Sequence, residues 1–350
     1  MPGGQTRDSQ WPGGPGRAAG WSAASRLDTE PFGPDETAML VRVAGRAPSI
    51  HNTQPWRFRV GADRVEVHAD PDRELAAADP AGRQRTMSCG AAVLDLRLAM
   101  SNLGYLTHTV LLPDPSEPGH LATVVRGRRH PPSEEEHHLY QAVPRRHTQS
   151  HGFLPVAITP QSRTRLHAAA RTEGAWVREP NLETRDEFAV IMVGAITTMV
   201  TDAAYRAELA RWTRLSADPP DGVPLDSLGG GPYPAEGMPR PYLLPPAASP
   251  EWMATRGLLG TMVLGTGADE PVDWLRAGQA LQRLLLTATG DGLVATFFSQ
   301  VVEMPVARRR TARILDAPGH PQAVLRVGYA AASAATTPRR PYPDVADVGG

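Results

Sequence analysis

The chain has 350 residues, a formal net charge of −1 and a single cysteine, Cys89. Its length suits two domains of ordinary size or one large domain with insertions. The balanced charge gives no reason to expect nucleic acid or an anionic membrane as a partner, one cysteine excludes an internal disulfide and a thiolate metal cluster, and no apolar run is long enough to span a bilayer.

Every basic side chain other than histidine is arginine, since the chain has no lysine. This absence excludes enzymes that form a Schiff base through lysine, among them the pyridoxal-phosphate enzymes. It also excludes a functional Walker A loop and a kinase active site. Any bound phosphate must therefore be held by arginine and backbone amides. The planar guanidinium group of arginine suits this role because it can form two parallel hydrogen bonds to one phosphate.

Residues 1–34 are rich in Gly, Pro and Ser and lack the apolar core of a secretory signal. This composition predicts a disordered N-terminal extension. The cytoplasm is the default location for a chain of this kind.

Residues 35–130 are predicted to form a first half. Asp35 can cap a helix that ends near Arg46. The remaining elements are strands over Trp56–Val60 and Val65–His68, an irregular polar stretch over 69–86, a helix over Ser88–Leu103 that Gly104 closes, and a strand over Leu121–Val125. The helix over Ser88–Leu103 is apolar nearly all round and should be buried.

Residues 131–350 are predicted to form a second half with the same order of elements. The patterns indicate helices over Ser133–Val143, Pro160–Thr172 and Glu183–Thr213, a strand over Thr261–Leu264, a buried helix over Trp274–Thr289 that Gly290 and Gly292 stop, and a strand over Gln322–Tyr329. In each half a buried helix ends at glycine and a strand follows. This correspondence indicates an internal duplication.

A stretch dense in Pro and Gly, Ser216–Pro250, interrupts the second half. It is far longer than an ordinary connection, so it is either disordered or a lid over a site. Its large apolar residues, Tyr233, Tyr242, Leu243 and Leu244, favour a lid.

The loop between the first predicted helix and strand carries the clearest site motif, Ala47-Pro-Ser-Ile-His-Asn-Thr-Gln-Pro-Trp-Arg-Phe58. Pro48 should end the helix and Pro55 should start the strand. Ser49, Asn52 and Gln54 lie on the short connection between these prolines, where they can present donors and acceptors to the edge of a flat polar ring. The alternative is a joint whose Asn and Gln only cap local backbone groups.

Three further groups of polar residues are candidates for ligand contacts. Arg145, Arg146 and Thr148 form one cationic and hydroxyl cluster, and Arg339 and Arg340 form a second. Ser299 and Gln300 follow the second buried helix and can reach the edge of a ligand. Alternatively, the arginine pairs only solvate the protein surface, and Ser299-Gln300 only ends a structural element.

Together these segments resemble the FMN-dependent nitroreductase superfamily, in its Acg-like actinobacterial branch. The resemblance covers Asp35–Val348. It rests on Arg46–Phe58, Ser88-Cys-Gly-Ala-Ala-Val-Leu94, Pro144-Arg-Arg-His-Thr148, Trp274-Leu-Arg-Ala-Gly-Gln-Ala-Leu281, His320-Pro-Gln322 and Thr337-Pro-Arg-Arg-Pro341.

The resemblance implies an α+β nitroreductase fold in which two tandem halves form an intramolecular pseudo-dimer, either monomeric or weakly homodimeric. Ordinary nitroreductases are homodimers whose FMN sites are built from both subunits, so a fused chain should hold one FMN. Carried over, Arg146, His147 and Thr148, with Arg145 beside them, match the Arg-His-Ser segment that binds the cofactor. The loop residues Pro48, Ser49, Asn52 and Gln54 stand for the partner subunit's loop, Arg339 and Arg340 for the basic phosphate contact, and Ser299 and Gln300 for contacts to the ring edge.

The implied activity is that of an NAD(P)H-dependent oxidoreductase. NAD(P)H would pass a hydride to flavin N5, and a small acceptor such as a nitroaromatic or a quinone would then take the electrons. No side chain is assigned as catalytic, because solvent can supply the protons. The alternatives are a flavin-sequestering protein whose lid blocks substrate, and a specialised oxidase or dehydrogenase of natural-product assembly on the same scaffold.

Cys89 and the histidines are candidates for other chemistry. Cys89 lies near the start of a predicted buried helix, where the helix N-terminus can lower a thiol pKa, but a structural role is favoured. His137-His138 and His147/His151 have no carboxylate or thiolate at ligand spacing, so the sequence predicts no metal site.

Overall fold

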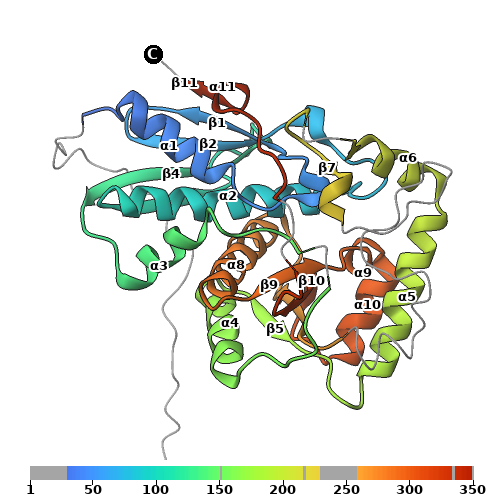
Figure 1. Cartoon of the computed structure of the whole chain (residues 1–350). Coiled ribbons are helices and arrows are strands. Elements are labelled where there is room, and N and C mark those ends of the chain that lie inside the picture. Colours follow the sequence, from blue (N-terminus) through green and yellow to red (C-terminus); the bar gives the residue numbers. More distant parts are fainter. Residues whose placement is uncertain (1–29, 150–151, 216–217, 229–257, 333–335, 349–350) are drawn as a thin grey trace, which may run out of the picture.

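The computed structural model describes residues 30–149, 152–215, 218–228, 258–332 and 336–348. Within them the fold is mixed α and β, with two main sheets and two long helices that lie between the sheets (Figure 1). This agrees with the α+β class expected from the sequence.

The first sheet has the strand order β11-β1-β2-β4-β3. Its strands are β1 (Trp56–Val60), β2 (Arg64–Ala69), β3 (Tyr105–Leu111), β4 (His120–Arg129) and β11 (Ala346–Val348). Only the β1–β11 pair is parallel among them. Because β11 pairs with β1, the C-terminal part of the predicted second half ends inside the first sheet.

One face of this sheet is covered by α1 (Pro34–Ala44) and α2 (Arg83–Asn102). The strands alternate, so that Phe58, Val65 and Val67 are buried against these helices while intervening residues face outward. Phe32 joins the same core, so packed structure begins before residue 35.

The second sheet has the order β5-β8-β10-β9 and is antiparallel. Its strands are β5 (Trp176–Arg178), β8 (Thr261–Thr266), β9 (Val294–Phe297) and β10 (His320–Gly328). Helices α4 (Pro160–Thr172) and α8 (Pro271–Gly290) cover one face, and α5 (Arg185–Thr201), α9 (Gln300–Glu303) and α10 (Pro305–Ile314) cover the other. Burial on both faces explains why every residue of β8 is apolar, small or a buried threonine.

The two long helices, α2 and α8, pack against each other through glycine. A Cβ on Gly90 of α2 would lie 2.3 Å from the carbonyl oxygen of Leu275, and one on Gly278 of α8 would lie 1.9 Å from that of Met87. Gly90 and Gly278 are each the eighth residue of their helix, and the residue that each one meets is the fifth residue of the other. The contact is therefore reciprocal, as in a two-fold symmetric interface.

The other described elements connect these layers. They are η1 (Ile50–Asn52), η2 (Pro71–Arg73), α3 (Glu134–Ala142), α6 (Ala203–Arg211), β6 (Thr213–Arg214), β7 (Val223–Pro224), η3 (Leu225–Leu228) and α11 (Tyr342–Val345). No single helix in the described ranges is long and apolar enough to cross a membrane; one bent pair, Arg185–Thr201 with Ala203–Arg211, passes by length and composition alone.

Several predicted elements differ from the observed ones. The helix expected over Glu183–Thr213 is two helices, α5 and α6, at 80° to each other, because the Asp202 side chain accepts the Tyr205 N–H at 2.8 Å and starts a new helix. The cap of α1 is Gly33, and Asp35 lies in its first turn. Of the predicted lid, residues 218–228 are described; its remaining residues, with Tyr233, Tyr242, Leu243 and Leu244, lie outside the described ranges, as do residues 1–29 of the predicted extension.

Candidate functional site

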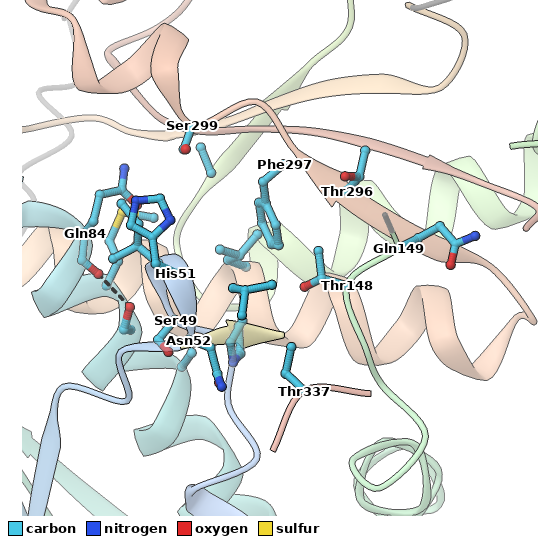
Figure 2. A pocket seen from close by; sticks show the side chains of 18 of the residues that line it. Ser49, His51, Asn52, Gln84, Thr148, Gln149, Thr296, Phe297, Ser299 and Thr337 are labelled. Atoms are coloured by element: carbon cyan, nitrogen blue, oxygen red, sulfur yellow. Dashed lines mark hydrogen bonds between the residues drawn. The ribbon is translucent and has the colours of Figure 1, made fainter. Parts of the chain in front are cut away.

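A cavity of about 190 Å³ lies between the two sheets, beside the first turns of α2. Segments from both predicted halves line it. They are the 48–52 loop, Gln84, Met87, Ser88 and Ala91 of α2, Arg146, Thr148 and Gln149, Val223 and Ser227, Leu281 of α8, Thr296, Phe297, Ser299, Gln300 and Val302, Ala323 and Val324 of β10, and Thr337 and Arg339. In Figure 2, Phe297 lies between a side that carries His51, Gln84 and Ser299 and a side that carries Thr148, Gln149 and Thr337.

The 48–54 loop has an unusual backbone. His51, Asn52 and Gln54 all have positive φ, at 48°, 53° and 51°. Residues other than glycine rarely adopt this conformation, and it persists only where surrounding contacts hold it. Such strain is typical of ligand-binding loops.

Asn52 and Gln54 supply those contacts. Asn52 Nδ2 donates to the carbonyl oxygen of Gly222 at 2.8 Å, and Asn52 Oδ1 accepts from Arg339 Nη1 at 3.0 Å. Gln54 Nε2 donates to the carbonyl of Pro220 at 2.9 Å, and its Oε1 accepts from the backbone N–H of Arg340 at 2.8 Å. These side chains join three segments that are distant in the sequence, and they fix the wall of the cavity.

One side of the cavity is cationic. Arg146 Nη2 donates to the carbonyl of Arg46 at 2.9 Å, and Arg339 Nη1 donates to Thr337 Oγ1 at 2.7 Å. The Nε of each of these two guanidiniums is buried and has no hydrogen-bond partner among the described residues. A buried donor without an acceptor is energetically unfavourable. The two free Nε–H groups can therefore donate to an anion bound in the cavity.

The charges of the two arginines lie close enough to interact. Burial lowers the pKa of Arg146 to about 10. Burial, and then the nearby charges of Arg146 and Arg46, lower the pKa of Arg339 to about 9. Both groups stay protonated at neutral pH. Burial raises the pKa of the adjacent Asp95 to about 7, so that carboxyl compensates only part of their charge.

The rest of the wall is neutral. Burial lowers the pKa of His51 to about 4, so its imidazole is uncharged at neutral pH. Gln300 Nε2 donates to the hydroxyl of Tyr205 at 3.3 Å, while its Oε1 has no partner within the described residues. Gln149 Oε1 is also unpartnered there. The cavity therefore combines an anion-binding side with neutral polar groups and apolar surface, as ligand sites commonly do.

The structure brings most of the predicted site residues together. Those that line the cavity are Pro48, Ser49, Asn52, Arg146, Thr148, Ser299, Gln300 and Arg339. Gln54, Arg145, His147 and Arg340 are not among the lining residues.

Each of these four residues has another partner, and those of Gln54 are given above. Arg145 is exposed and donates through Nε to the carbonyl of Gln141 at 3.3 Å. His147 Nδ1 lies 3.1 Å from the carbonyl oxygen of Arg145. Arg340 forms an ion pair with the buried Asp70 at 3.4 Å. Arg339 therefore lines the cavity, whereas its neighbour Arg340 is paired with Asp70 outside it.

Other lining residues were not predicted from the sequence. His51 and Gln149 adjoin predicted residues in the chain and could have been named by position. Gln84 could not, because 69–86 was predicted to be irregular. Helix α2 in fact begins at Arg83, since the Asp79 carboxylate accepts the backbone N–H groups of Gln84 and Arg85 at 3.0 and 2.8 Å.

Cys89 lies in the core behind this wall, fully buried, with its Sγ donating to the carbonyl of Pro55 at 3.4 Å. Burial raises the pKa of its thiol to about 12. We therefore expect the native protein to react with Ellman's reagent at pH 8 far more slowly than the urea-unfolded protein does. Fast release of one equivalent of chromophore from native protein would contradict this placement.

Comparison with known proteins identifies the family of this chain. No family model matches the chain. Among curated proteins, three from Mycobacterium tuberculosis (strain ATCC 25618 / H37Rv) are similar to it. "Putative NAD(P)H nitroreductase Rv3131" is 30% identical over 88% of this chain and 89% of its own length, and "Putative NAD(P)H nitroreductase acg" is 31% identical over 89% and 95%.

The third relative, "Uncharacterized protein Rv3127", is 30% identical over 88% of this chain and 92% of its own length. Each likeness covers 88% or more of both proteins. The chain therefore belongs to the nitroreductase superfamily, in its Acg-like branch.

Proposed function

We propose that this chain is an FMN-binding, NAD(P)H-dependent oxidoreductase that holds its flavin in the cavity between the two sheets. The observation that carries the proposal is the pair of buried guanidiniums, Arg146 and Arg339, which line the cavity with unpartnered Nε atoms. Membership of the nitroreductase superfamily makes FMN the anionic ligand to expect.

The residues present fit FMN. Arg146 and Arg339 would hold its phosphate, because a buried guanidinium and a phosphate form strong, charge-assisted hydrogen bonds. The unpartnered amide oxygen of Gln300 offers an acceptor for an N–H group of a polar heteroaromatic ring. Phe297, Leu281 and Ala91 supply apolar surface for the flat faces of that ring.

In the mechanism, bound FMN supplies two-electron redox chemistry between NAD(P)H and a small oxidised acceptor such as a nitroaromatic or a quinone. The arginine pair binds and orients the anionic end of the ligand. His51, uncharged at neutral pH, adds no positive charge to the wall of the cavity. The buried side chains of Met87 and Val302 exclude water from the wall behind the ligand.

We further propose that the two halves form an intramolecular pseudo-dimer with one FMN per chain. The reciprocal packing of Gly90 and Gly278 in the two long helices supports this proposal. So does the composition of the cavity, because the first half contributes the 48–52 loop and the second contributes Arg146. Titration with FMN should saturate at one equivalent per chain; two equivalents would contradict this arrangement.

The test of the function is the visible spectrum of the purified, FMN-supplied protein before and after NADPH or NADH under anaerobic conditions. We expect flavin absorbance that stays with the protein through gel filtration and bleaches on addition of a nicotinamide. Failure to retain FMN would refute the binding proposal. Retained FMN that dithionite bleaches but neither nicotinamide does would refute the oxidoreductase and favour flavin sequestration instead.

A further inference from the structure

The outward face of the first sheet carries a second cluster of polar residues. Glu66 and His68 are two residues apart on β2, so their side chains point to the same face. His120 on β4 is the register partner of His68. None of these residues lines the cavity, because α2 covers the opposite face of the sheet.

These side chains are close together and sheltered. One ligand atom from each of Glu66, His68 and His120 lies within 4.8 Å of the others. His68 Nε2 is 3.0 Å from Glu66 Oε2. The two imidazoles are stacked with centroids 4.4 Å apart, and the exposed fractions of His68 and His120 are only 7% and 9%.

Each ring also has an orienting partner on its other side. Glu117 Oε1 lies 3.6 Å from His68 Nδ1, and Thr123 Oγ1 lies 2.9 Å from His120 Nε2. Histidines that bind metals characteristically engage a carboxylate or another polar group through the second ring nitrogen, which fixes the tautomer and the ring orientation. In His68 this leaves Nε2, which already faces Glu66 Oε2, as the ligand atom for a metal.

We propose that Glu66, His68 and His120 form a binding site for a divalent transition-metal ion of the Zn²⁺ class. Two imidazoles and one carboxylate are a donor set that zinc accepts and that Mg²⁺ and Ca²⁺, which prefer oxygen ligands, do not favour. The negative charges of Glu66 and Glu117 would compensate the positive charge of the ion. Arg59, whose Nη1 lies 3.3 Å from Glu117 Oε1, neutralises part of this negative charge.

The metal-free geometry shows what binding must change. Stacked rings cannot both direct a lone pair at one ion, so the His120 imidazole has to turn about its Cβ–Cγ bond and give up its contact with Thr123, while His68 keeps its contact with Glu117. That bond rotates easily, and the ligands come from adjacent inner strands of a paired sheet, so the backbone need not move. The sequence predicts no metal site because His68 and His120 are far apart in it and are brought together only by the β2–β4 pairing.

Isothermal titration of the untagged full chain with ZnCl₂ tests this site. We expect one Zn²⁺ per chain with micromolar or tighter affinity. His68→Gln and His120→Gln should each weaken binding by about tenfold or more, and Glu66→Gln, which keeps the size of the side chain, should also weaken it. His108→Gln, at an exposed position of β3 on the same sheet, is the matched control and should bind as the original chain does.

The result that would overturn the proposal is absence of stoichiometric Zn²⁺ binding, or binding that His68→Gln, His120→Gln and Glu66→Gln leave unchanged. Thermal unfolding of each variant checks that it is folded, and Glu66→Gln serves if a histidine variant does not fold. The outcome is independent of the flavin site, since Zn²⁺ binding is measured without FMN and uses none of the cavity residues.

Discussion

Replacing Arg146 with alanine should weaken FMN binding by about ten- to a hundredfold. A hydrogen bond to a charged group contributes about 1.5–3 kcal/mol, and every 1.4 kcal/mol is about tenfold in affinity. Arg146 is buried, its Nε has no partner among the described residues, and its charge lies beside that of Arg339. We expect Arg339→Ala to act in the same direction, and quenching of flavin fluorescence on binding measures both.

Two neighbouring arginines provide matched controls. Arg145→Ala removes an exposed guanidinium one residue away from Arg146 and should leave FMN affinity unchanged. Arg340→Ala should have a much smaller effect than Arg339→Ala, because Arg340 is paired with Asp70 outside the cavity. If all four variants bind FMN equally well, the phosphate is held elsewhere; equal losses from Arg145→Ala and Arg146→Ala would indicate a general electrostatic effect.

Local patterns predicted the regular elements well where one rule acted alone. The strand over Trp56–Val60 and the helix over Pro160–Thr172 have the predicted bounds. The alternation of apolar and basic residues determines the bounds of the strand, and a threonine cap followed by proline determines the start of the helix. The strands β3, β5, β9 and β11 were not predicted, because their stability comes from pairing with β4, β8, β10 and β1 rather than from their own residues.

Eight of the twelve residues predicted from the sequence line the cavity, because the family resemblance singled out their motifs. What the sequence could not decide is which member of each arginine pair faces the cavity. That choice depends on partners that are distant in the sequence. Arg340 forms an ion pair with Asp70, and Arg146 is oriented by its hydrogen bond to the carbonyl of Arg46. The role of Asn52 and Gln54 was also open, and their side chains mainly join the loop to residues 220–222 and 338–340.

Replacing Gly278 with alanine should destabilise the protein by about 3 kcal/mol or prevent it from folding. The added Cβ would lie 1.9 Å from the carbonyl oxygen of Met87, which is backbone and cannot rotate away. Overpacking of a tight core typically costs about 1–3 kcal/mol, and more when backbone must shift. Gly90→Ala should act similarly, since its Cβ would lie 2.3 Å from the carbonyl of Leu275. Urea unfolding followed by circular dichroism measures both changes.

Gly194→Ala is the matched control, because Gly194 is an exposed residue of α5 with nothing within 4 Å of the added atom. There alanine should stabilise the helix by roughly 0.5–1 kcal/mol. Met87 and Leu281 line the cavity from α2 and α8, so separating these helices should also loosen FMN binding. A Gly278→Ala protein with an unchanged urea midpoint would show that the helices do not pack this closely. The reciprocal glycine contact would then no longer support a pseudo-dimer.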